Sequence, residues 1–147
     1  MSDQRITPKL RSVARLRAQN CCEYCCSQAR FSMQPFTVDH IVPKSKGGKT
    51  TSNNLAWSCQ GCNNHKYNKT EAFDLISGQR VPLYNPRKQR WRAHFVWNYD
   101  CSLIIGLTAT GRATVEALYI NRQELVDLRR ILYSVDQHPP KKFPKRQ

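Results

Sequence analysis

Residues 38–66 read VDHIVPKSKGGKTTSNNLAWSCQGCNNHK, and this stretch decides the fold. It contains an Asp-His pair, a Gly-Gly turn, an Asn-Asn-Leu segment and a Cys-x-x-Cys motif that runs into Asn, His and Lys. A second Cys-x-x-Cys motif lies upstream. The cysteines of the two motifs are Cys22, Cys25, Cys59 and Cys62. Two such pairs are a typical ligand set for structural zinc, so the sequence predicts one Zn²⁺ that fastens both ends of the intervening segment.

Two further cysteines flank the first motif and leave its register open. Cys21 and Cys26 are either buried small hydrophobic residues or replacement ligands. The alternatives to zinc are a redox-active dithiol pair and a set of free buried thiols. The paired spacing favours the metal over both.

The charge balance points to a polyanionic partner. The chain has 147 residues with 24 Lys and Arg against 10 Asp and Glu, a formal net charge of +14. Cationic side chains on phosphates release condensed counterions, which favours nucleic acid, whether DNA or RNA. A merely soluble, charged surface is the alternative. There is no long apolar run and no strongly amphipathic basic helix, so we expect no membrane association.

Residues 1–20 are polar and lack the apolar core of a signal peptide. We therefore expect the protein to remain in the cytoplasm. Thiols stay reduced there, which again favours metal ligation over disulfide bonds.

The segment from residue 7 to residue 78 predicts an N-terminal helix followed by two strands and a second helix. Thr7 and Pro8 suit a helix start, and Asn20 suits its end. Residues 36–38 predict a strand that residues 41–42 continue, and residues 55–57 predict its partner. A helix is expected from Gln60 to about residue 75 or 76, ending before Gly78.

The C-terminal half predicts a smaller extension. Residues 79–92 read as an irregular linker, residues 91–97 as a strand in a hairpin with residues 103–107, and residues 110–120 as a short helix. Asn121 and Glu124 resemble a capping box before a last helix. The expected division is a core at 1–78, a packed hairpin and helix extension at 79–135, and a basic disordered tail at 136–147.

The Asp-His pair carries the predicted chemistry. Hydrolysis of a phosphodiester needs a base to take a proton from water and a cation to neutralise the phosphate. His40 has the pKa range of a base, and Asp39 offers oxygen ligands for Mg²⁺. Asn54 is expected to orient the loop, and Lys66 is expected to meet phosphate as a point charge.

These residues resemble the HNH endonucleases, the ββα-metal nuclease superfamily. The matching pieces are CEYC at 22–25, VDHIVPKSKGG at 38–48, NNL at 53–55 and CQGCNNHK at 59–66. The resemblance implies an α+β fold with a ββα-metal core. It implies His40 as general base, Asp39 as a ligand of the catalytic cation and Asn54 as the residue bracing the base's loop. Residues 86–129 also resemble the C-terminal extension of some bacterial HNH proteins.

One position departs from the common family pattern. Many members have His directly after the second Cys-x-x-Cys motif, whereas this chain has Asn63. Its carbonyl oxygen can bind Mg²⁺ or another hard divalent cation, more weakly than a charged ligand does. His65 is the rival. It lies about 200° further around a helix, so the two side chains cannot face one ion.

Three functions compete. The first is a metal-dependent HNH endonuclease that hydrolyses DNA, with RNA left open. Because one ββα site attacks one strand, cutting both strands requires a dimer or repeated nicking, and the sequence leaves the oligomeric state open. The second is a non-catalytic, zinc-fastened nucleic-acid-binding module. The third, a redox or regulatory zinc protein, leaves the positive charge and the Asp-His pair unused.

Overall fold

The computed structural model describes residues 5–145 as a mixed α+β fold, which confirms the predicted fold class. Its centre is the unit formed by β1 (Thr37–His40), β2 (Leu55–Ser58) and α2 (Gln60–Lys66). β1 and β2 pair antiparallel, with Val38 opposite Trp57 and His40 opposite Leu55. β1 ends at His40, so the predicted continuation through residues 41–42 is wrong; the backbone bends before Pro43.

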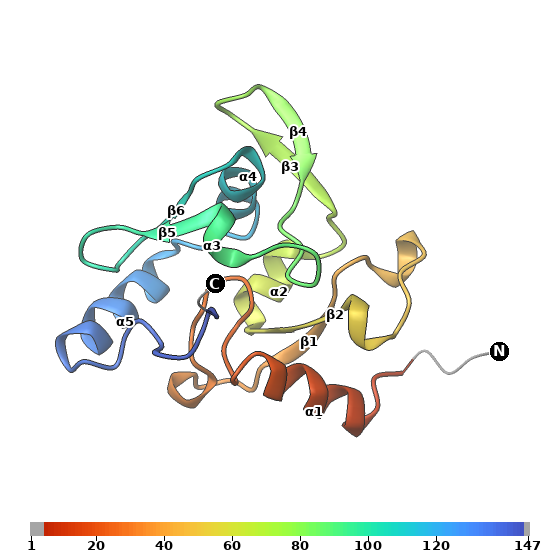
Figure 1. Ribbon diagram of the computed structural model, residues 1–147, viewed down its shortest axis with the longest axis horizontal. Helices are drawn as coiled ribbons and strands as arrows, with labels where there is room; N and C mark the ends of the chain where they lie inside the picture. The colour runs from red at the N-terminus through yellow and green to blue at the C-terminus, as the bar shows by residue number, and fades with distance from the viewer. Residues whose placement is uncertain (1–4, 146–147) are drawn as a thin grey trace.

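The N-terminal helix lies across this unit, at the bottom of Figure 1. α1 (Pro8–Arg17) begins as predicted, because the Thr7 hydroxyl accepts a hydrogen bond from the Leu10 backbone NH. Beyond its end Asn20 adopts a left-handed conformation, with φ 56°. Arg17 donates to the backbone oxygens of Ser52 and Leu55, which fixes the helix against the start of β2.

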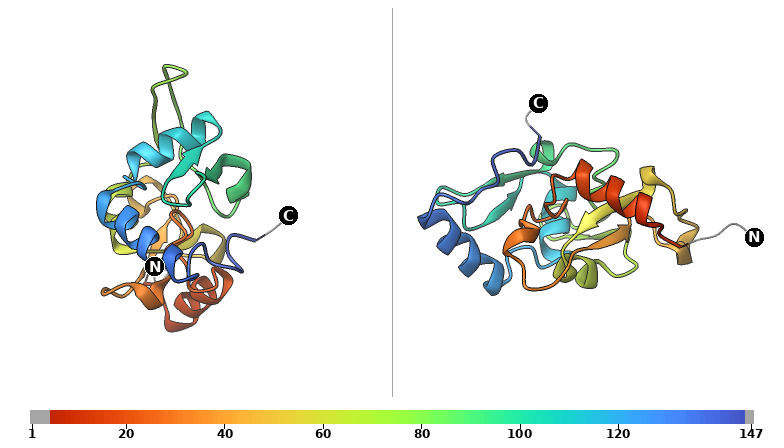
Figure 2. Two further views of the ribbon diagram at one scale, coloured as in Figure 1. Left: turned by 90° about the vertical axis from the view of Figure 1, so that its left-hand side faces the viewer. Right: turned by 90° about the horizontal axis from the view of Figure 1, so that it is seen from below.

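The helix after the second cysteine motif is shorter than predicted. α2 stops at Lys66, and the residues expected to continue it form a hairpin of β3 (Glu71–Asp74) and β4 (Gln79–Pro82). Asp74 explains the difference, because its backbone and side-chain oxygens accept from the NH groups of Gly78 and Ser77 and so close a turn. The hairpin projects from the rest of the molecule (Figures 1 and 2).

The predicted linker and the start of the predicted strand at residues 91–97 also differ from the structure. β4 occupies the start of the linker, and a helical turn, α3 (Trp91–His94), precedes a short β5 (Phe95–Trp97). Trp91 and Phe95 are buried with ring centroids 5.1 Å apart, so tertiary packing determines this segment. The hairpin of β5 with β6 (Ile104–Gly106) is confirmed, as is the helix α4 (Ala109–Ala117).

The last helix, α5 (Gln123–Ser134), does not begin with the predicted capping box. Arg122 occupies the cap position without a side-chain hydrogen bond to the helix backbone. The Asn121 amide instead pairs with the backbone NH and C=O of Ile104, at 2.9 Å each. Asn121 therefore joins the β6 strand to α5.

Residues 136–145 lie against the fold rather than forming the expected disordered tail. His138 is buried and its Nε2 lies 2.8 Å from the Cys101 backbone oxygen, while Phe143 is also buried. Burial of these two side chains against the rest of the fold offsets the entropy of ordering the segment. Residues 1–4 and 146–147 lie outside the described part of the chain.

One cluster of buried residues runs through both predicted parts of the chain. It includes Leu55 and Trp57 from the core and Trp91, Phe95 and Ile104 from the extension. None of the helices between residues 5 and 145 is both long and apolar enough to cross a membrane.

Candidate metal centre and nuclease site

The two cysteine motifs converge at one point. The sulfur atoms of the four buried cysteines all lie within 4.8 Å of one another; the residues are Cys22, Cys25, Cys59 and Cys62. Sulfurs around a tetrahedral zinc at about 2.3 Å stand about 3.8 Å apart, and Cys25 Sγ lies 3.7 Å from Cys59 Sγ. The donor set and its spacing fit a structural zinc ion, and the predicted register of the first motif is confirmed.

The two flanking cysteines remain outside this cluster. Cys21 and Cys26 are buried. Burial, together with the nearby Cys25, raises the pKa of Cys21 to about 12, and burial also raises that of Cys26. Both side chains are therefore neutral thiols that fill space, which is the first of the two alternatives that the sequence left open.

An arginine from the extension lies over the cysteine cluster. Arg122 Nη2 is 3.3 Å from Cys59 Sγ, and Nη1 is 3.7 Å from Cys62 Sγ. A zinc ion with four thiolates carries a net charge of about −2, which a guanidinium at this distance partly compensates. Gly61 leaves the room for it, since a Cβ there would lie 2.4 Å from Arg122 Nη2.

Replacing Gly61 with alanine is expected to weaken metal retention. Helix propensity alone favours alanine over glycine by about 0.5–1 kcal/mol, so a destabilised variant would point to displacement of Arg122. Loss of such an outer contact typically costs about 10- to 100-fold in metal affinity.

The measurement is the rate of zinc transfer to a colorimetric chelator. Arg122→Gln should match Gly61→Ala, whereas Arg130→Gln, an exposed position on the same helix, should behave as wild type; equal rates in all four proteins would contradict this role.

The carboxylate of Asp39 is buried between two partners. The Tyr24 hydroxyl donates to Oδ2 at 2.6 Å, and Lys66 Nζ lies 3.1 Å from the same oxygen and 3.3 Å from Oδ1. Only about 5% of the Asp39 side chain is exposed. Burial raises the pKa of Asp39, while Lys66 and the Tyr24 hydrogen bond act in the opposite direction.

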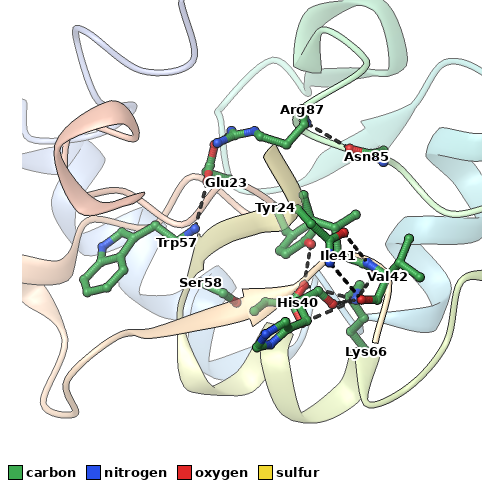
Figure 3. Close-up of polar contacts among 12 residues, drawn as sticks. Glu23, Tyr24, His40, Ile41, Val42, Trp57, Ser58, Lys66, Asn85 and Arg87 are labelled. Atoms are coloured by element: carbon green, nitrogen blue, oxygen red, sulfur yellow. Dashed lines mark hydrogen bonds and ion pairs between the residues drawn. The ribbon is translucent and has the colours of Figure 1, made fainter. Parts of the chain in front are cut away.

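Lys66 does not lie where the predicted phosphate contact requires it. It is 1% exposed, and its ammonium group also donates to the backbone oxygens of His40 and Ile41 at 3.1 and 3.0 Å (Figure 3). A lysine enclosed in this way cannot meet a phosphate as a free charge. Lys66 instead joins α2 to the end of β1, because the bend after His40 turns two carbonyl groups toward it.

His40 is half-buried at the end of β1, next to Asp39 in the chain. Its Nε2 lies 2.9 Å from the Thr50 hydroxyl, and within residues 5–145 we find no hydrogen bond to Nδ1. Burial lowers the pKa of His40, with a further lowering from Lys44 and an opposing effect from Asp39. The ring is therefore neutral near pH 7, with one nitrogen held and the other able to accept a proton.

Asn54 holds the loop between β1 and β2. Its Oδ1 accepts from the Val42 NH at 2.9 Å, and its Nδ2 donates to the oxygens of Val42 and Lys49 at 3.0 and 2.9 Å. Gly48 permits the tight loop, since a Cβ there would lie 1.7 Å from the Val42 oxygen. These hydrogen bonds link both ends of the loop that follows His40, as the expected bracing role of Asn54 requires.

The two rival ligands on α2 have different surroundings. Asn63 lines an open groove together with Ser45 and Tyr67. The ring of His65 instead lies 4.6 Å from that of Tyr119. Of the two side chains, Asn63 is the one that lines this groove.

Three residues near the site carried no recognisable signal in the sequence. Thr50 holds His40, Tyr24 holds Asp39, and Arg122 lies over the cysteine sulfurs. Thr50 and Arg122 lie outside the quoted motifs, and Tyr24 occupies one of the two variable positions of the first Cys-x-x-Cys motif, so only the tertiary structure shows their roles.

Polar and aromatic residues of the extension are occupied by internal contacts. Arg87 forms an ion pair with Glu23, and Trp91 Nε1 donates to the Tyr24 backbone oxygen at 3.0 Å. Arg112 pairs with both oxygens of Asp74 at 3.0 Å. Through Arg87 and Trp91 the extension thus holds the first cysteine loop in place.

Comparison with known families agrees with this geometry. The family model described as HNH endonuclease matches residues 22–69, which run from Cys22, the first cysteine of the cluster, to just beyond α2. No curated protein matches the chain, and neither does any solved structure. Members of this family act on nucleic acids, and the match spans the cysteine cluster together with Asp39, His40 and Asn54. Residues 22–69 of this chain therefore match the HNH endonuclease family and contain four converging cysteines that could hold a metal ion.

Proposed function

We propose that this protein is an endonuclease that hydrolyses phosphodiester bonds in DNA, with His40 as the general base. The observation that carries the proposal is the state of the His40 ring. Thr50 holds Nε2, Nδ1 is available, and burial favours the neutral form. A general base needs this combination of fixed orientation and an unprotonated nitrogen.

Asp39 and Asn63 are the residues we propose to hold a catalytic divalent cation. Carboxylate and amide oxygens suit Mg²⁺ or Mn²⁺, and the cation would neutralise charge on the scissile phosphate. The Asp39 oxygens already accept from Tyr24 and Lys66, so a cation must compete with the Lys66 ammonium for this carboxylate.

The net charge of +14 supports a nucleic-acid substrate. Lysines of the loop between β1 and β2 are exposed beside the site, among them Lys44, Lys46 and Lys49. Such side chains contact phosphates and position a strand without reading its sequence.

A supercoiled plasmid tests the proposal. Zinc-loaded protein with Mg²⁺, Mn²⁺ or Ni²⁺ should convert it to relaxed or linear DNA. Parallel digestion of a labelled RNA and a DNA of the same sequence identifies the preferred polymer. Preference for RNA would contradict the choice of DNA while leaving hydrolysis intact.

A second function has one observation in its favour. Because Lys66 and Tyr24 occupy the Asp39 carboxylate, the domain fits a non-catalytic binding module as well as an enzyme. The module predicts plasmid binding, seen as a mobility shift, with no relaxed circles under any of the three cations. Relaxation by wild-type protein excludes it.

A further inference from the structure

The backbone at the end of α2 has an unusual conformation. Tyr67 has φ 52° and ψ −122°, and the NH of Lys69 donates to the Lys66 oxygen at 3.0 Å. Residues 66–69 therefore form a β-turn whose second residue has the dihedral angles of a type II′ turn. Glycine is the usual residue there, because a Cβ is strained at these angles. A tyrosine in this position reduces the stability of the fold.

Within residues 5–145 the Tyr67 side chain itself forms no polar or ring contact that would offset this strain. The Tyr67 residue is 67% exposed, and within residues 5–145 its side chain has neither a hydrogen bond nor a ring contact. Strained residues of this kind are found more often at functional sites than elsewhere. The exposed ring is thus available to something outside the chain.

The ring lines the groove that holds Asn63. This groove has a volume of about 480 Å³ and is formed by Ser45, Asn63, Asn64, Tyr67 and Asn68. Among the residues from 5 to 145 no lysine or arginine lines it, although the chain as a whole carries a net charge of +14. Amide groups form hydrogen bonds with the edges of bases, and an aromatic ring stacks on their faces. The lining therefore suits a nucleobase better than a phosphate.

We propose that Tyr67 stacks on an unpaired nucleobase of the DNA strand that lies next to Asn63. A base inside a duplex already has both faces covered by its neighbours, so the preferred substrate has single-stranded nucleotides at this point. The inference rests on the proposed function for its nucleic-acid substrate. It adds a substrate class and a residue that selects it.

Tyr67→Gly and Tyr67→Phe separate strain from stacking. Both are placed in the full-length, zinc-loaded His40→Ala protein without added catalytic cation, so that cleavage does not interfere. Fluorescence anisotropy measures affinity for a labelled single-stranded oligonucleotide and for its duplex. Thermal unfolding is followed in parallel. Tyr99→Ala, at a 93% exposed tyrosine on the β5–β6 hairpin, is the matched control.

Tyr67→Gly should unfold at a higher temperature and bind the single strand about tenfold more weakly, with the duplex affinity changed less than twofold. Tyr67→Phe and Tyr99→Ala should bind as the parent does. Equal single-strand affinity in Tyr67→Gly and Tyr67→Phe would overturn the inference. So would an equal loss on the duplex, a lower unfolding temperature of Tyr67→Gly, or a parent protein that binds no single strand.

Binding and cleavage can fail separately. If wild-type protein cuts no DNA while the Tyr67 variants show the expected difference in binding, the proposed hydrolysis is wrong and the stacking role stands. If the wild type cuts DNA while Tyr67→Gly binds single strands as tightly as the parent, the stacking role is wrong and the proposed hydrolysis stands.

Discussion

Replacing Cys59 with serine is expected to release the zinc ion and unfold the region from residue 22 to residue 69. A serine hydroxyl is a poor zinc ligand, and the ion joins two segments that are otherwise far apart in the chain. Binding of structural zinc contributes about 10–16 kcal/mol in small zinc peptides, against a typical domain stability of about 5–15 kcal/mol. Loss of one ligand therefore removes enough free energy to unfold this region.

Zinc per chain, measured by atomic emission, and the far-ultraviolet circular dichroism spectrum test this expectation. The matched control is Cys21→Ser, a buried cysteine directly before Cys22 of the first cysteine motif. Its sulfur donates to the Gln19 backbone oxygen at 3.5 Å, a bond that a hydroxyl can replace. The control should keep one zinc and its fold. A Cys59→Ser protein with a full zinc content and a native spectrum would contradict the four-cysteine site.

Replacing Lys66 with methionine is expected to destabilise the protein by about 3–5 kcal/mol, because it leaves a buried carboxylate without its charged partner. Methionine keeps most of the side-chain volume, so the loss reflects the Asp39 contact and the two backbone oxygens that Lys66 satisfies. Urea denaturation at pH 7 measures it.

Lys69→Met is the control for this prediction, since Lys69 is exposed at the end of the turn that Lys66 begins, and within residues 5–145 its Nζ donates to the His65 oxygen alone. It should change stability by less than about 0.5 kcal/mol. If Lys66→Met were as stable as wild type and only bound DNA more weakly, the original prediction of a phosphate contact would be right and the buried arrangement wrong.

The features that the sequence predicted well are those with local or periodic signals. Cysteine spacing identified the four cysteines whose sulfurs converge, because two residues between ligands suit one tight turn. Aromatic and β-branched residues at 36–38 located β1, the apolar run at 55–57 located β2, and Thr7 with Pro8 located the start of α1. The motif around Asp39 and His40 also identified the HNH domain that the family match confirms.

The features it missed depend on contacts between distant segments. Residues 71–82 form a hairpin because Asp74 closes a turn and pairs with Arg112, a partner far along the chain. Asn121 does not cap α5, because its side-chain amide forms hydrogen bonds with the backbone NH and C=O of Ile104. Lys66 is buried although its sequence neighbours are polar, since Asp39 and two carbonyl groups compete successfully with water for its ammonium.

The central claim is that His40 activates water for phosphodiester hydrolysis. The most direct test compares plasmid nicking by wild-type protein and His40→Ala, purified in parallel and matched for zinc content and unfolding temperature. We predict that wild type nicks the plasmid with an added divalent cation and that His40→Ala is slower by about 10²- to 10⁴-fold. Equal nicking by the two zinc-loaded proteins, or nicking by neither, would contradict the claim.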